Sequence, residues 1–151
     1  MAYFFSKACE YGIQATLYIA TLPERRVGIK EIAHELRIPV HFLAKILQLL
    51  SEKRVLSSYK GVQGGFTLQR APEHIHLIDI VEAIDGLGFF EHCVLGFPGC
   101  DDEKPCPVHH RWGELRSHIH SMLSSDSLAD LLPASREKIA CVIRDYNTAK
   151  E

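Results

Sequence analysis

Three cysteines and a histidine lie close together in one short stretch of the sequence. Residues 93–112 read CVLGFPGCDDEKPCPVHHRW, so that Cys93, Cys100 and Cys106 are separated by six and five residues and His109 follows Cys106 by three. Thiolates and imidazoles are the ligands of zinc and of iron–sulfur clusters. Thiols without a metal can also act as a redox switch. The stretch therefore predicts a metal centre or a thiol sensor.

The spacing of the cysteines favours one of these chemistries. Structural zinc sites usually take their cysteines from close C-x2-C pairs, and the gaps here are wider. Wider gaps let separated thiolates surround a larger object, for which an iron–sulfur cluster is the natural candidate. On spacing alone, zinc and a metal-free thiol switch remain the alternatives. The glycines and prolines of the stretch fit a loop that is shaped by what it binds.

The composition predicts one folded domain of ordinary size. The chain has 151 residues, of which 46% are hydrophobic, and this is enough for a core. It contains neither the run of about 20 apolar residues that a membrane span needs nor a signal-peptide pattern. We therefore expect a cytoplasmic protein without a membrane partner, with reduced cysteines. Cys9 and Cys141 stand alone on helical patterns and are expected to be buried.

The net charge of −2 averages two unlike regions. Residues 24–63 carry eight Lys or Arg against four Glu, whereas residues 73–105 carry eight Asp or Glu against one Lys. The field near a surface follows nearby charges more than the total. The first region can therefore meet nucleic acid although the whole chain is acidic.

Apolar periodicity predicts the elements that lead up to the cysteine stretch. A first helix follows Ser6 as N-cap and stops before Pro23. Two apolar stripes in residues 28–56 flank Arg37-Ile38-Pro39, which is the pattern of a helix-turn-helix. Strand-like runs on either side of KGVQG then predict a hairpin. The fold class is therefore mostly α with a small β-hairpin wing, a winged helix-turn-helix.

The remaining segments are helical on either side of the cysteine loop. A helix over residues 77–84 ends near Gly86, and a long helix over residues 112–123 follows the loop. The long helix has little to pack on in so small a domain, so we expect it to pair with a second subunit. A last helix is expected to be capped by Ser135. The predicted division is a DNA-binding domain, a cluster-binding loop, and a dimerisation helix with a C-terminal extension: residues 1–86, 87–107 and 108–151.

The second helix of a helix-turn-helix enters the major groove of DNA with its N-terminal end. That end offers three side chains, and the wing offers three more beside glycines that allow the backbone to approach a duplex. The predicted DNA-binding residues are His41, Phe42 and Lys45 on the helix and Tyr59, Lys60 and Gln63 on the wing. Phe42 has a second interpretation, since its ring can instead complete the core. Double-stranded DNA is the predicted partner.

A resemblance to a known family rests on four segments. They read, in order, IKEIAHELRIPVHFLAKILQLLSEKRVLSS, KGVQGGFTLQR, IHLIDIVEAIDG and C-x6-C-x5-C-P-V-H-H-R-W. Over residues 6–132 the chain resembles the winged-helix regulators that include IscR and NsrR. The most specific parts are the glycine pair of the wing and the cysteines that run into C-x-x-H-x-x-W.

The resemblance implies a ligand set in two versions. The IscR type implies a 2Fe-2S cluster on three cysteines and a histidine, which here are Cys93, Cys100, Cys106 and His109. The NsrR type implies a 4Fe-4S cluster whose fourth ligand is a carboxylate from the first helix of the partner subunit, and Glu10 is nearest that position. We favour 2Fe-2S and keep 4Fe-4S as the alternative. The first cysteine gap is one residue longer than the C-x5-C of both types.

The resemblance also implies a function. It predicts a homodimeric transcription factor, such as a repressor, that binds a palindromic DNA site and senses iron–sulfur status, redox or nitric oxide through its cluster. A zinc-stabilised or cofactor-free thiol-sensing regulator is the alternative. An enzyme is not expected, because no nucleophile elbow, phosphate-binding loop or paired carboxylates accompany the cysteines.

Overall fold

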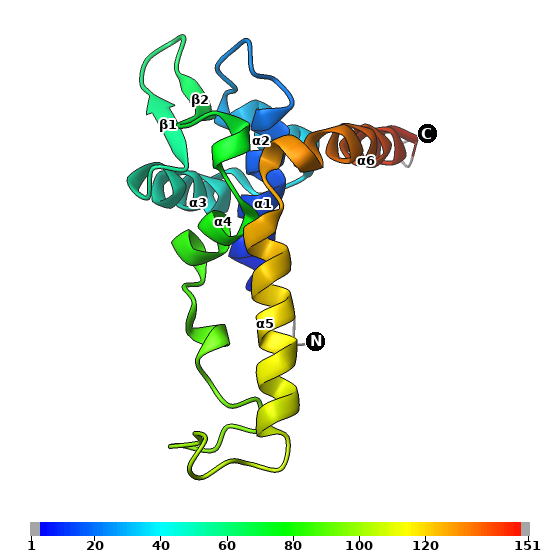
Figure 1. Ribbon diagram of the computed structural model, residues 1–151. Coiled ribbons are helices and arrows are strands. Elements are labelled where there is room, and N and C mark those ends of the chain that lie inside the picture. Colours follow the sequence, from blue (N-terminus) through cyan, green and yellow to red (C-terminus); the bar gives the residue numbers. More distant parts are fainter. Residues whose placement is uncertain (1–3, 149–151) are drawn as a thin grey trace.

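The computed structural model describes residues 4–148, without the side chains of Tyr146 and Asn147. A helical body carries a hairpin at one end, and one long helix runs from the body to the cysteine loop at the opposite end (Figure 1). Four helices form most of the body: α1 (Lys7–Ala20), α2 (Ile29–Leu36), α3 (Val40–Glu52) and α4 (Leu77–Ile84). The other elements are β1 (Leu56–Tyr59), β2 (Gly65–Leu68), the short 3-10 helices η1 (Pro72–His74) and η2 (Gly88–Phe90), α5 (His109–Ser125) and α6 (Leu128–Thr148).

Helix α1 is the centre of the body. Its N-terminus is capped as the sequence predicts, because the Ser6 hydroxyl accepts a hydrogen bond from the Cys9 amide at 3.0 Å. A Cβ atom at Gly12 would collide with Ile84 of α4 and crowd Ile46 of α3. The glycine therefore lets three helices meet closely around one apolar core.

The predicted helix-turn-helix is confirmed. Helix α2 ends at Arg37, which adopts the left-handed conformation with φ 56°, and α3 begins directly after Pro39. Between them Ile38 is only 3% exposed, so the turn is fixed by an apolar side chain in the core. Tyr18 of α1 and Arg25 both bind the Glu31 carboxylate, which ties α2 to the centre of the body.

The predicted wing is also confirmed. Strands β1 and β2 pair antiparallel, with Tyr59 opposite Gly65. Val27 extends this sheet by exchanging two backbone hydrogen bonds with Phe66, at 3.0 and 2.9 Å. Gly65 has φ 144°, and a Cβ atom there would lie 2.8 Å from the Val27 carbonyl oxygen. Only glycine fits this close approach.

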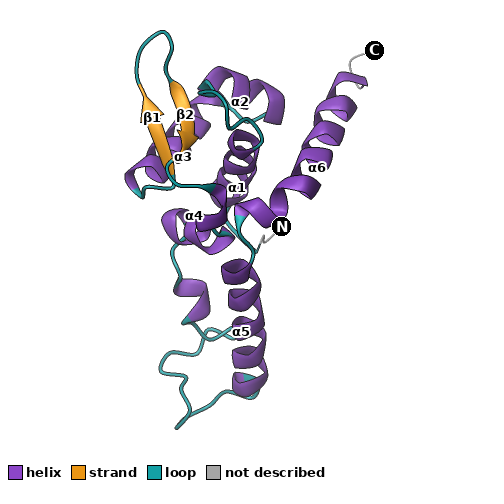
Figure 2. Cartoon of the chain, turned by 45° about the horizontal axis from the view of Figure 1, so that its top comes forward, coloured by secondary structure: helices purple, strands orange, loops and turns teal. Residues whose placement is uncertain are grey.

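Helix α5 belongs to the body over only part of its length. Its C-terminal half packs on α1 and α4 through a small apolar cluster formed by Leu123, Val81 and Cys9, each at most 2% exposed. Its N-terminal half extends away from the body to the cysteine loop (Figure 2). The helix therefore links the loop to the elements that carry the wing and α3.

The last helix begins earlier than predicted. Helix α6 starts at Leu128, because Ser127 and Asp130 cap it reciprocally: the Ser127 amide donates to the carboxylate and the Asp130 amide to the hydroxyl, at 3.0 and 3.2 Å. The prediction that Ser135 is the cap is therefore wrong, and Ser135 lies inside the helix. Cys9 is buried as expected, but Cys141 is only partly buried.

The fold class is the predicted one, six α-helices and a two-stranded hairpin in the described part of the chain. None of the helices within residues 4–148 has the length and hydropathy needed to cross a membrane. The division into residues 1–86, 87–107 and 108–151 stays a prediction, and its outer limits, 1 and 151, lie outside the described residues.

We predict that Gly65→Ala destabilises the protein. The new methyl group would meet the Val27 backbone in a conformation that side chains disfavour, so the free energy of unfolding should fall by about 1–3 kcal/mol. Urea unfolding followed by circular dichroism measures this. As a control, Gly113→Ala in α5 meets only a flexible arginine end and should raise stability by up to about 1 kcal/mol. Equal stability of wild type and Gly65→Ala would contradict the assigned wing geometry.

Candidate functional site

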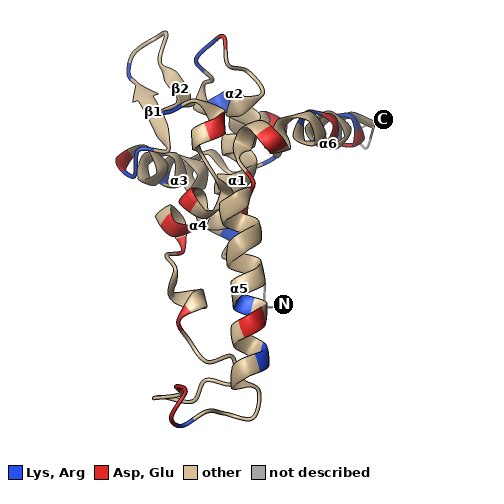
Figure 3. Cartoon of the chain, viewed as in Figure 1, with Lys and Arg blue, Asp and Glu red and all other residues tan. Residues whose placement is uncertain are grey.

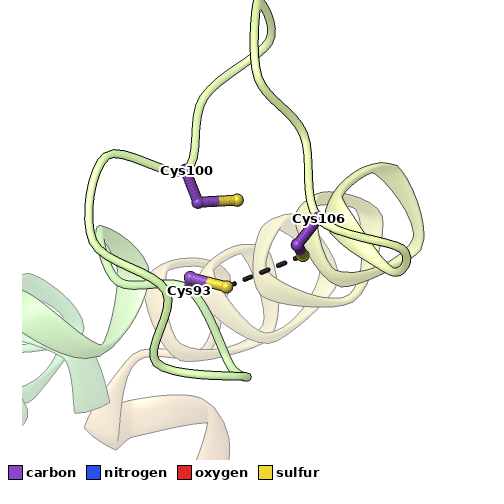
Figure 4. Close-up of side chains that lie close together, drawn as sticks. All are labelled: Cys93, Cys100 and Cys106. Carbon is purple, nitrogen blue, oxygen red and sulfur yellow. Dashed lines mark hydrogen bonds between the residues drawn. The ribbon is translucent and has the colours of Figure 1, made fainter.

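The three cysteines of the loop converge on one point. Their sulfur atoms all lie within 4.8 Å of one another, and those of Cys93 and Cys106 are 3.6 Å apart. All three side chains are partly buried, and their sulfurs face the same space (Figure 4). The three cysteines that the sequence analysis identified therefore form one group of thiols in the folded chain.

The geometry suits a metal centre. Two thiolates at about 2.3 Å from one tetrahedral metal atom lie about 3.8 Å apart, which is close to the separation of Cys93 and Cys106. Iron in iron–sulfur clusters and zinc both accept such thiolates. The three residues are therefore placed to act together as ligands of a metal ion or cluster.

His109 adjoins this group at one corner. It is the first residue of α5, its side chain is 16% exposed, and its Nδ1 atom lies 3.2 Å from the Cys100 sulfur. Its Nε2 atom lies 3.0 Å from a carboxylate oxygen of Asp102. Histidines that bind metals commonly donate their other N–H to a carboxylate in this way. The imidazole is therefore held with one nitrogen toward the sulfurs.

Glu10 lies elsewhere in the same chain. It is part of α1, in the body, whereas the cysteine loop lies at the far end of α5 (Figure 1). Its carboxylate pairs with Lys7 at 2.9 Å. Within one chain, the structure therefore brings His109 but not Glu10 to the cysteines.

The Cys93 thiol of the loop differs in acidity from the buried Cys9 thiol. Burial raises the pKa of the Cys93 thiol, but hydrogen bonds from the Phe97 and Leu95 amides, together with those from Cys106 and Cys100, bring the pKa down to about 7. Burial, with Asp85 nearby, raises the pKa of the Cys9 thiol to about 12. Thiolate is the form that reacts and binds metal. Cys93 can therefore react or bind a metal near neutral pH, whereas Cys9 can do neither.

Side chains of α5 attach the start of the cysteine loop to the helix. The Trp112 indole donates to the His92 carbonyl at 3.0 Å, and Arg116 donates to the Phe90 carbonyl at 2.7 Å. These bonds hold the segment just before Cys93 against α5. Sequence reasoning missed this anchoring and the contact of Asp102, because an acidic run and a tryptophan have no spacing that reveals their partners.

Five of the six predicted DNA-binding residues are exposed on α3 and the wing, and Phe42 is the exception. His41, Lys45, Lys60 and Gln63 are exposed, and Tyr59 is 40% exposed. Figure 3 shows basic residues on one side of the wing and, next to an acidic residue, on the loop between α1 and α2.

Phe42 is the exception among the six. It is partly buried against the core, with its ring 5.8 Å from that of Tyr11 in an edge-on arrangement. The second interpretation of this residue, completion of the core, is thus the one that the geometry favours.

A winged helix-turn-helix that carries a cysteine site defines a class of transcription regulators, and comparisons with known proteins give the family. Residues 5–134 match the Rrf2 family, described as iron-dependent transcriptional regulators. The chain belongs to this family, whose members are regulators and not enzymes. It is 35% identical, over 93% of its length and 99% of the relative's, to a putative HTH-type transcriptional regulator of Aquifex aeolicus.

Solved structures share the fold. T. potens IscR is 26% identical with a TM-score of 0.70, and the match covers 91% of this chain and 92% of that one. CymR, the global cysteine regulator of B. subtilis, is 23% identical with a TM-score of 0.73, covering 88% of this chain and 98% of that one. The family resemblance and the fold class predicted from the sequence are thereby confirmed.

We predict that the cysteines of the metal-free, reduced protein react with alkylating agents in a fixed order. Cys93 should react fastest at pH 7, because about half of it is thiolate there, and its rate should rise as the pH passes through 7. Cys9, fully buried and with a raised pKa, should react only after unfolding. Pulsed alkylation with peptide mass spectrometry measures both rates. If Cys9 reacted as fast as Cys93, the assigned burial and acidity would be wrong.

Proposed function

We propose that this protein is a homodimeric regulator of transcription that senses iron–sulfur status, redox or nitric oxide through a cluster on Cys93, Cys100, Cys106 and His109. The observation that carries the proposal is the convergence of three thiols on one point of an otherwise irregular, turn-rich loop. The similarity to T. potens IscR supports it. When bound, the cluster would supply redox-active iron to a loop that continues directly into α5.

The contacts of the ligands favour histidine as the fourth member and two iron atoms as the cluster. Cys93 and Cys106 form one close pair, and Cys100 and His109 form another. Two pairs of ligands match a 2Fe-2S cluster, in which each iron takes two protein ligands. Asp102 supports this assignment because it holds His109 in the orientation that a ligand needs. A 4Fe-4S cluster with Glu10 of the partner subunit remains the alternative.

A second candidate function follows from the same thiols. Cys93 has a lowered pKa and its sulfur lies 3.6 Å from that of Cys106. A thiolate attacks most readily when its pKa is near the ambient pH. A cofactor-free thiol sensor, or a zinc-stabilised form of the same loop, is therefore the alternative to the cluster.

The exposed face of α5 supports the homodimer. Leu115 is 55% exposed and Met122 is 53% exposed. They lie two turns apart on one face of α5, and a continuous exposed apolar face commonly marks an interface. A symmetric pair of subunits would present two α3 helices to DNA, which calls for a palindromic site. We expect the regulator to be located in the cytoplasm, together with the DNA that it binds.

Purification without oxygen tests the cluster. We expect a coloured protein with iron and acid-labile sulfide in equal amounts, and two irons per chain for the favoured cluster. Cys93→Ser, Cys100→Ser and Cys106→Ser should each lose the colour, because each removes a ligand. Cys141→Ser, the matched control on α6, should keep it. A colourless protein with one zinc per chain would support the zinc alternative and refute the cluster.

The fourth ligand is tested by comparing variants of the two candidates. His109→Ala should lower cluster content and change the spectrum. Asp102→Asn should weaken cluster retention about 10- to 100-fold, because losing the hydrogen-bond partner of a ligating histidine commonly costs that factor in affinity. Glu10→Gln should leave both unchanged. The reverse pattern, in which only Glu10→Gln alters the spectrum, would assign the NsrR type of ligand set.

DNA binding is tested with a duplex that the wild-type protein selects from a random-sequence library. Lys45→Ala and Lys60→Ala should each weaken binding, about threefold to tenfold, and Lys60→Ala should lower the slope of log affinity against log salt by about one. Arg144→Ala on α6, away from the wing, is the control and should bind as wild type. Unchanged affinity of both lysine variants would exclude the proposed surface.

A further inference from the structure

We propose that Arg26 is a positioning residue for DNA binding, which holds Tyr59 and the tip of the wing in the conformation that meets the duplex. The inference rests on the proposed contact between wing and DNA. Arg26 lies in the loop between α1 and α2, more than thirty residues before the part of the wing that it touches. No sequence pattern indicates this role.

The guanidinium of Arg26 makes two contacts with the wing. Its Cζ atom lies 3.9 Å from the centroid of the Tyr59 ring, which is a cation–π distance. Its Nη1 atom donates to the carbonyl of Gln63 at 3.3 Å. One side chain thus binds the end of β1 and the far side of the turn that follows it.

The backbone places Arg26 in this position. The neighbouring residue Val27 is fully buried and exchanges hydrogen bonds with Phe66 of β2. Because side chains alternate along an extended strand, burial of Val27 sends Arg26 to the outer side, next to the wing. Gly65 makes the approach possible, since a Cβ atom there would crowd the Val27 backbone.

The tip of the wing needs such support. Within residues 60–64 the backbone closes the turn with a hydrogen bond from the Gly64 amide to the Gly61 carbonyl at 2.9 Å. Val62 at the tip is completely exposed and adds no packing. Ordering a loop on binding costs affinity, and a contact that orders it beforehand reduces this cost.

The neighbouring Arg25 does not share this role. Its guanidinium binds the Glu31 carboxylate of α2 at 2.9 Å, so it stabilises the helix-turn-helix.

Lysine is a poor replacement for Arg26, because only a planar guanidinium stacks on a ring while donating a hydrogen bond at its edge.

A double-mutant cycle tests the inference, with the selected duplex as probe and titration by fluorescence anisotropy. Arg26→Ala and Tyr59→Leu should each weaken binding about fivefold, and the double variant should be no weaker than the weaker single variant. Arg26→Lys should restore little of the affinity. The salt dependence should stay that of wild type, because a positioning residue makes no phosphate contact of its own.

The contrary results are distinct. If the two losses multiplied and Arg26→Ala lowered the salt slope by about one, Arg26 would contact a phosphate directly and the positioning role would be wrong. Arg144→Ala on α6, away from the wing, should bind within twofold of wild type, and an equal loss there would also overturn the assignment. Urea unfolding of each variant confirms that the fold is intact. If Lys60→Ala and Tyr59→Leu both bind DNA as wild type does, the proposed contact between wing and DNA is wrong. If these two variants bind more weakly but Arg26→Ala binds as wild type, only the inference about Arg26 is wrong.

Discussion

The close packing of α1 against α3 and α4 is the constraint on which the rest of the structure depends. At Gly12 there is no room for a side chain, and Ile46 and Ile84 fill the space from either side. This contact fixes the helix that is expected to enter DNA relative to the helix that leads into the cysteine loop. The wing and α2 then join the same body through Val27 and Glu31.

The same packing gives the cysteine site a physical connection to the body. Ser6, which caps α1, also donates from its amide to Asp85 at 2.8 Å, at the point where α4 ends and the loop segment begins. Helix α5 returns from the loop and inserts Leu123 between α1 and α4. A packed helix moves as a unit, so a change in the loop can be passed to the body or to a second subunit. This is the basis for linking cluster state to DNA affinity.

Much of the fold could be predicted from the sequence because its signals are local. The apolar stripes on either side of Arg37-Ile38-Pro39 and the glycines around the wing each specify an element through neighbouring residues. The predicted start of α6 was wrong because Pro133 is the sixth residue of the helix, and a proline at this position suggests that a helix begins later. The cap formed by Ser127 and Asp130 lies before it.

The cysteine site also has features that the sequence predicts and features that it does not. The spacing of Cys93, Cys100 and Cys106 indicated a ligand set, and the structure brings their sulfurs together. Asp102 and Arg26 could not be found from sequence, since each acts through a partner that only the folded chain places beside it.

The central claim is that the state of the cysteine site sets the affinity for DNA. The most direct measurement compares the same anaerobically purified protein, before and after removal of its cluster, in binding to the duplex that it selects. Coupling between two sites in one protein is commonly fivefold or more, so the account predicts that the two affinities differ by about tenfold. Equal affinities of the two forms, with the cluster shown to be present in one and absent from the other, would contradict it.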